Sequence, residues 1–379
     1  MRVYFDNAAT TPLDTEVWEA MTPHFLESYG NPSSIHSHGR QARSAIEKSR
    51  KTIAELLNTS PSEIFFTSGG TEADNMAICS SVNTFGLKHA ITSKVEHHAV
   101  LHTLENLEKK GKLKLSYVNL DEKGSIDYGH LEELLNQNSR SLVSLMHANN
   151  EIGNLSDIDK IGEICHEHQA IFHSDTVQAM GHYTHDLSAG KYDFVVGAAH
   201  KFHGPKGSGF LYINSKNKID PMILGGAQER NMRGGTENVA GIVGIAKALE
   251  IAYRDLDDDT KHIQALKSRM INSLTEQIPG VSFNGRSDDP KESLYTVLNV
   301  SLPESEDNEM LLFSLDIKKI SASGGSACAS GTDIGSHVLK ALNTDPKRGA
   351  VRFSFSKFNT IEEVDYTVNT LAEMVNVHA

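Results

Sequence analysis

Short apolar runs alternate with amphipathic stretches through the middle of the chain. The apolar runs predict strands over residues 63–67, 89–92, 113–118, 141–146, 170–173, 192–197 and 209–213. The amphipathic stretches between them predict helices over residues 71–82, 100–110, 130–137 and 157–168. Strands that alternate with helices are typical of a mostly parallel sheet with helices on both faces. The pattern therefore predicts an α/β fold, with a large domain over residues 15–250.

A different pattern begins near residue 250. A helix over 241–253 leads into the acidic stretch 255–259, and further elements are predicted as a helix over 261–277, a strand over 296–300 and a helix over 308–315. A loop of small residues (321–332), a strand and a helix close the chain. Since 379 residues exceed what one core usually holds, we expect a smaller α+β domain formed by residues 251–379 together with residues 1–14.

Composition and charge narrow the classes of function. The chain is 39% hydrophobic and 22% charged, as in ordinary globular proteins. Its formal net charge is −13 without any run of basic residues, so we expect no direct nucleic-acid partner. The N-terminus does not resemble a signal peptide, and no apolar run reaches the length of a membrane span. Three scattered cysteines do not make a disulfide framework and favour a cytoplasmic location.

Polar motifs follow several of the predicted strands, where ligand crevices form in open α/β sheets. Lys201 stands directly after one strand, in AAHKFHGPKG. A buried lysine can lose its proton and act as a nucleophile, although most lysines in loops are only surface residues. Asp175 ends another strand, where it could pair with a pyridinium nitrogen or merely cap a turn. Gln178 follows three residues later and could donate to the same ligand.

A glycine turn between a strand and a helix, in TSGGTEADN, offers a seat for phosphate at the helix N-terminus. The alternative is a capping box in which Thr71 caps the helix and Asp74 fills its third position. The chain lacks the glycine patterns of dinucleotide-binding and P-loop proteins. The turn is therefore a candidate phosphate site of another kind.

Three histidines lie close together in TSKVEHHAVLH. His97 could stack on a flat ligand or transfer protons. His98 and His102 have the spacing of a helical zinc pair, but no third ligand is indicated, so we expect no metal. Arg352 lies between apolar residues of a strand. It would be costly to bury without an anion, and a substrate carboxylate is a suitable one.

Cys328 lies in GGSACASGT, a segment almost without bulky side chains. An exposed thiol in such a loop can act as a nucleophile that moves. The alternative for a lone cysteine, a small buried hydrophobe, suits Cys79 and Cys165 better, because both lie in helical patterns. Cys328 is therefore the candidate reactive thiol.

Taken together, these motifs resemble the cysteine desulfurases, which belong to the fold-type-I, class-V aminotransferase group of pyridoxal-phosphate enzymes. The resemblance covers residues 6 to about 355 and rests on nine segments in the family's order: DNAATTP, YGNPSS, TSGGTEADN, TSKVEHHAV, MHANNEIG, HSDTVQAMG, AHKFHGPKG, RGGTEN and GGSACASGT. One departure is Ala198, which stands where the family often has a serine that contacts phosphate.

The resemblance implies a role for each matching residue. For the cofactor, it implies that Lys201 carries pyridoxal 5'-phosphate, His97 stacks on its ring, and Asp175 and Gln178 contact the ring nitrogen and the phenolic oxygen. It implies that the phosphate is held by Gly70, Thr71 and His200, and by Thr236 from the other subunit of a homodimer. It also implies that Asn150 orients cofactor and substrate, that Arg352 binds the substrate carboxylate, and that Cys328 accepts the sulfur.

The implied activity is conversion of L-cysteine into L-alanine, with the sulfur held as a persulfide on Cys328, which could transiently ligate an iron-sulfur cluster. A sulfur-acceptor protein, such as an iron-sulfur scaffold or a tRNA-thiolation protein, would then be a partner. The alternatives are a selenocysteine lyase or an aminotransferase of the same group, a non-catalytic sulfur-relay protein and a cofactor-free cysteine hydrolase.

Overall fold

The computed structural model describes residues 1–138, 140–324 and 335–376. A seven-stranded sheet with the order β2-β8-β7-β6-β5-β3-β4 forms its centre. The strands of this sheet are β2 (Ile64–Thr67), β3 (His89–Thr92), β4 (Lys114–Tyr117), β5 (Leu142–Ser144), β6 (Ile171–Ser174), β7 (Phe194–Ala198) and β8 (Gly209–Ile213). The neighbours from β4 to β7 pair in parallel, and β8 pairs antiparallel with β7 and β2. The predicted α/β class with a mostly parallel sheet is confirmed.

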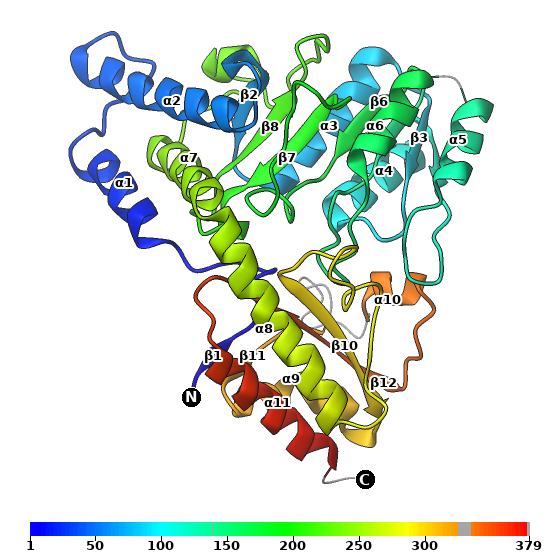
Figure 1. Ribbon diagram of the computed structural model, residues 1–379. Helices are drawn as coiled ribbons and strands as arrows, with labels where there is room; N and C mark the ends of the chain where they lie inside the picture. The colour runs from blue at the N-terminus through cyan, green and yellow to red at the C-terminus, as the bar shows by residue number, and fades with distance from the viewer. Residues whose placement is uncertain (139, 325–334, 377–379) are drawn as a thin grey trace.

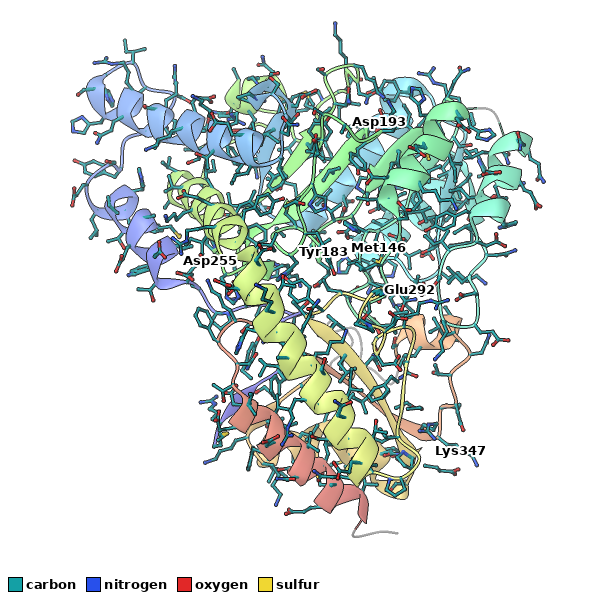
Figure 2. All side chains as sticks on the ribbon, viewed as in Figure 1. Met146, Tyr183, Asp193, Asp255, Glu292 and Lys347 are labelled. Atoms are coloured by element: carbon teal, nitrogen blue, oxygen red, sulfur yellow. The ribbon has the colours of Figure 1, made fainter. Side chains whose placement is uncertain are left out.

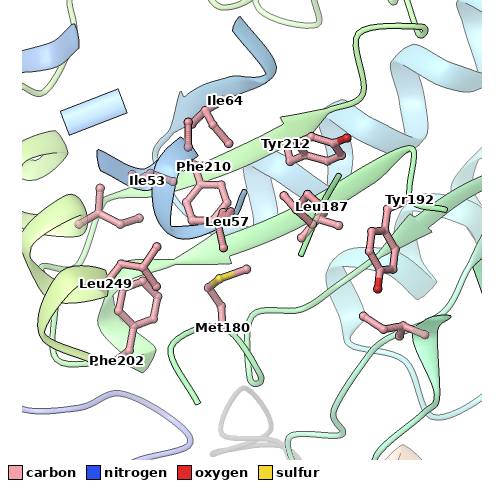
Figure 3. Packing of buried hydrophobic residues seen from close by; sticks show 14 of the residues in the cluster. Ile53, Leu57, Ile64, Met180, Leu187, Tyr192, Phe202, Phe210, Tyr212 and Leu249 are labelled. Atoms are coloured by element: carbon pink, nitrogen blue, oxygen red, sulfur yellow. The ribbon is translucent and has the colours of Figure 1, made fainter. Parts of the chain in front are cut away.

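Helices lie on both sides of this sheet (Figure 1). They are α1 (Thr15–Leu26), α2 (Ser37–Leu56), α3 (Gly70–Phe85), α4 (His98–Lys109), α5 (Tyr128–Gln137), α6 (Ile158–Glu167) and α7 (Val239–Arg254). Residues of α2, α6 and α7 pack into one apolar core, whereas those of α3 and α4 pack into another. Figure 3 shows the first core, where Ile53 and Leu57 approach Phe210, and Phe202 approaches Leu249.

The C-terminal part has its own sheet and core. Here β10 (Val297–Glu304) pairs antiparallel with β9 (Ser282–Phe283) and β12 (Arg348–Ser354), and β1 (Val3–Tyr4) pairs in parallel with β11 (Ile320–Ser321). The helices are α8 (Leu256–Gln277), α9 (Leu311–Ile317), α10 (His337–Ala341) and α11 (Ile361–Asn376). Figure 1 shows α8 and α11 lying side by side below the large sheet. One apolar core contains Val3 and Phe5 together with apolar residues of α8, β10, α9, β12 and α11, so the N-terminal strand belongs to this core.

Two expectations about helices need correction. The acidic stretch is part of α8, which begins at Leu256, because acidic side chains in a first turn interact favourably with the helix dipole. The expected helix 308–315 is divided between a 3-10 helix (Glu306–Met310) and α9. Helix α2 was not expected, since its buried face is built mostly of small residues and one arginine, Arg50.

Arg50 is buried because it has a buried partner of opposite charge. Its guanidinium forms a salt bridge of 2.8 Å with Glu229, a residue far along the chain. Burying a charge is tolerated when it is paired and hydrogen-bonded.

In the described ranges, no helix is long and apolar enough to cross a lipid bilayer.

Candidate active site

A cavity of about 250 Å³ opens at the carboxyl ends of the central parallel strands. Its wall contains residues from the N-terminal segment, from the loops of the large sheet and from β12. The expected site residues that line it are Gly70, Thr71, His97, Asn150, Asp175, Gln178, His200, Lys201 and Arg352. Met146, which also lines it, is labelled in Figure 2 where the large sheet faces the C-terminal part. The tertiary structure thus brings distant motifs to one place.

Lys201 reaches the cavity through a short 3-10 turn (Ala199–Lys201) that directly follows β7. Its Nζ donates hydrogen bonds to the carbonyls of Ala8 and Ala9, at 2.6 and 2.9 Å. The amide of Gln178 donates to the same Ala8 carbonyl at 3.0 Å. The N-terminal segment therefore forms part of the wall, a contribution that the sequence did not indicate beyond the motif DNAATTP.

Asp175 and His97 face each other across the cavity floor. Asp175 follows β6, and its Oδ1 accepts a hydrogen bond from the backbone N–H of Val177 at 3.0 Å. His97 caps α4, with Nδ1 accepting from the N–H of Ala99 at 3.2 Å. Burial lowers the pKa of His97, although the charge of Asp175 opposes this effect. The side chains of Asp74, His97 and Asp175 come close together: one oxygen or nitrogen atom from each lies within 4.8 Å of those from the other two.

The N-terminus of α3 forms another side of the cavity. Its cap is Gly69, which has a φ of +152° and makes no side-chain cap hydrogen bond. The capping box of Thr71 and Asp74 is therefore wrong, because Asp74 is buried below the helix start. A Cβ on Gly70 would lie 2.8 Å from a methyl group of Val177, so any other residue there would force Val177 to shift. The uncapped backbone N–H groups remain available to an anion.

His200 lies beside this helix end. Its Nδ1 is 3.2 Å from the hydroxyl of Thr10. Burial, assisted by the charges of Lys201 and Lys206, lowers the pKa of His200 to about 4. His200 is therefore neutral near pH 7, and it would bind an anion through a hydrogen bond rather than through its charge.

Arg352 is 1% exposed. An anion was expected beside it, and the protein itself supplies one. One terminal nitrogen, Nη2, forms a salt bridge of 2.8 Å with Asp6, while the other, Nη1, donates to the carbonyl of Asn150 at 2.8 Å. Within the described ranges, Nε of Arg352 is buried without a hydrogen-bond partner. The role of Asp6 was missed, because nothing in the sequence links residues 6 and 352.

The groups around this cavity fit pyridoxal phosphate. One cavity is surrounded by a group suited to each part of that cofactor. An amine suits its aldehyde, a carboxylate its ring nitrogen, a helix N-terminus with a hydroxyl its phosphate, and a flat imidazole its ring face. The fit rests on the chemistry of the side chains, and the missing serine at Ala198 removes only one possible phosphate contact.

Two expected site residues do not line the cavity. Thr236 is exposed. Two salt bridges hold its segment: Arg233 pairs with Glu72 of α3 at 2.9 Å, and Glu229 pairs with Arg50 of α2 at 2.8 Å. Cys328 lies outside the described residues. The last described residues before that segment include Ser323, whose backbone pairs with that of Arg352. His337, soon after the segment, has Nε2 2.9 Å from the carbonyl of Glu96.

His98 and His102, the other two histidines of the segment TSKVEHHAVLH, form a stack of rings. The ring of His98 stacks on that of His102 at 4.6 Å and 8°, and lies 4.4 Å from that of His337. Parallel rings at this separation do not direct their nitrogens at one point, so the pair is not arranged as a zinc chelate.

The chain is similar to known proteins along nearly its whole length. The sequence pattern of the family Aminotransferase class-V matches residues 3–367. "Cysteine desulfurase IscS" from Dictyoglomus turgidum is 43% identical, over 98% of this chain and 94% of its own length. "Putative cysteine desulfurase IscS 1" from Bacillus subtilis is 41% identical, over 99% and 98%. A solved structure titled NifS-like protein has a TM-score of 0.91 and 38% identity, with 100% of both chains covered.

Proposed function

We infer, because the chain belongs to the class-V aminotransferase family, that it is a cysteine desulfurase that uses pyridoxal phosphate and converts L-cysteine into L-alanine. The observation that carries the inference is the meeting of Lys201, Asp175 and Arg352 in one cavity. An amine, a carboxylate and a guanidinium there provide for a carbonyl cofactor, its ring nitrogen and a substrate carboxylate.

We propose the following roles for the chain's own residues. Pyridoxal phosphate, when bound, supplies an aldehyde for amines and an electron sink for the carbon next to the substrate carboxylate. Lys201 holds the cofactor and later takes the proton from Cα of cysteine. Asp175 holds the proton on the ring nitrogen. Arg352 fixes the substrate carboxylate through hydrogen bonds that its buried Nε and terminal nitrogens can donate.

The sulfur step is assigned to Cys328. Its thiolate attacks the sulfur of the bound cysteine, so a sulfur–sulfur bond forms and the bond from Cβ to sulfur breaks. The electron pair of the broken bond remains with Cβ, which takes up a proton and becomes the methyl group of alanine. The products are alanine and a Cys328 persulfide, and His97 is positioned to carry the proton. The proximity of Ser323 and His337 to the cavity wall supports this role.

We further propose a cytoplasmic homodimer in which Thr236 contacts the phosphate in the partner subunit, since Thr236 is exposed and its segment is firmly anchored. The persulfide would pass to an acceptor protein such as an iron-sulfur scaffold. The division into a large domain (15–250) and a small one (1–14 and 251–379) remains part of the proposal. The separate apolar core that joins Val3 and Phe5 to apolar residues of α8, β10, α9, β12 and α11 supports it.

The direct test is to incubate the purified protein, supplied with pyridoxal phosphate and a thiol reductant, with L-cysteine. Equal amounts of alanine and sulfide are expected. With a keto acid added as amino acceptor, 3-mercaptopyruvate in place of alanine and sulfide would indicate an aminotransferase. Turnover with selenocysteine but not cysteine would indicate a selenocysteine lyase. Either outcome would overturn the proposed function.

Arg352→Lys should raise the KM for cysteine about tenfold to a hundredfold while kcat changes less, because a lysine cannot make the paired hydrogen bonds of a guanidinium. Initial rates at varied cysteine concentration measure this effect. Asp6→Asn is the matched control, since it removes the salt bridge but leaves the guanidinium. An equal rise of KM in Asp6→Asn would show that Arg352 serves only the internal pair.

A further inference from the structure

Three buried carboxyl groups lie together at the cavity floor. Asp74 of α3, Glu96 just before α4, and Asp175 after β6 are 1%, 1% and 7% exposed. The two charges that most affect Asp74 are those of Asp175 and Glu96, both negative. Other ionisable groups that face this cluster are His97, His173, His337 and Lys201. Because like charges in a buried space repel strongly, the three carboxyl groups cannot all be ionised near pH 7.

Asp74 lies against a histidine that is buried with it. Its Oδ1 is 3.3 Å from Nε2 of His173, and within the described ranges neither atom has a hydrogen-bond partner. The other nitrogen of His173 is 2.8 Å from the hydroxyl of Ser144. If Nδ1 donates to Ser144, Nε2 is an acceptor; if Nδ1 accepts from the hydroxyl, Nε2 itself carries a proton. Two acceptors at this distance would repel each other, so a proton has to lie between them.

The surroundings favour the oxygen as the carrier of that proton. Burial, followed by the charge of Asp175, raises the pKa of Asp74 well above its usual range. Burial also lowers the pKa of His173 to about 3, which disfavours an imidazolium. Both effects point to a neutral pair in which the carboxylic acid donates to the imidazole.

Glu96 is neutral for a related reason. Its Oε1 accepts hydrogen bonds from the hydroxyl of Ser93 and the backbone N–H of Met146, both at 3.0 Å. Its Oε2 is buried and has no partner in the part of the chain that the structure describes. Burial raises the pKa of Glu96 to about 8, even though these hydrogen bonds oppose the rise.

We propose that Asp74 is a positioning residue whose protonated carboxyl group donates to His173, so that neither Asp74 nor Glu96 adds a negative charge beside the cofactor ring. The proposal rests on the proposed function, because it concerns the balance of charge around pyridoxal phosphate. One carboxylate opposite one protonated ring nitrogen makes a neutral buried pair. A second charge on Asp74 would stay uncompensated beside a site that must also accept a phosphate and a substrate carboxylate.

Infrared spectroscopy tests the protonation states directly, in the apoprotein and in the holoenzyme. A protonated carboxyl group has a carbonyl band that a carboxylate lacks. Asp74→Asn should remove one such band at neutral pH. Glu96→Gln should remove a second band, which in the unmodified protein fades as the pH rises through about 8. Asp186→Asn, the matched control, replaces an exposed carboxyl group whose pKa is lowered by hydrogen bonds from Asn58 and Ser188, and it should remove none. Retention of every band in Asp74→Asn would overturn the proposal.

Cofactor affinity tests the consequence. Asp74→Asn keeps a neutral donor toward His173, so its Kd for pyridoxal phosphate should stay within about twofold of the unmodified protein. Asp74→Ala leaves Nε2 of His173 unpartnered, and its Kd should rise about tenfold. Equal weakening in both variants, or in neither, would contradict the assigned role. A failure of the proposed function would differ, because the unmodified protein would then bind no cofactor at all while its infrared bands remained.

Discussion

Lys201→Ala is expected to lower the rate of cysteine turnover by roughly 1,000-fold or more, since it removes both the covalent attachment of the cofactor and the base for the Cα proton. The amine is positioned for this role by two backbone carbonyls, those of Ala8 and Ala9, at the cavity wall. Sulfide release measures the loss. Reduction with borohydride followed by peptide mass analysis should find the cofactor mass on the peptide that contains Lys201.

Lys206→Ala is the matched control for this experiment. Lys206 is exposed and lies five positions further along the same loop. It should keep both turnover and the labelled peptide. If the cofactor mass were found on another lysine, or if Lys201→Ala kept normal turnover, the assignment of Lys201 would be wrong.

Cys328→Ala is expected to bind pyridoxal phosphate normally but to lose sulfide release by several orders of magnitude, because the nucleophile of the sulfur step is removed. The visible spectrum of the bound cofactor, which depends on Lys201 and Asp175, should be unchanged. Incubation with radiolabelled cysteine should leave sulfur on the unmodified protein and none on the variant.

Cys79→Ala is the comparison here, since Cys79 is partly buried on α3 and burial raises the pKa of its thiol. A thiol with a raised pKa supplies less thiolate for attack on sulfur. This variant should therefore still become labelled. Labelling of Cys328→Ala at the normal level would exclude Cys328 as the sulfur acceptor.

The sequence alone determined the fold class and most elements of the large sheet. The strands β3 (His89–Thr92) and β8 (Gly209–Ile213) lie where the apolar runs predicted them. This succeeded because strands buried on both faces of a sheet are short, continuous apolar runs that end in polar residues. For the same reason the sequence pattern was enough to make Lys201 and Asp175 candidates, since each directly follows a strand.

Only the tertiary structure decided which residues meet around the site. It placed the carbonyls of Ala8 and Ala9 at Lys201, paired Asp6 with Arg352, and set Asp74 against His173. These contacts join residues far apart in the chain, and nothing in the local pattern of either partner records the other. Local periodicity reflects which face of an element is buried, whereas pairing and protonation depend on distance and on exclusion from water, which exist only once the chain has folded.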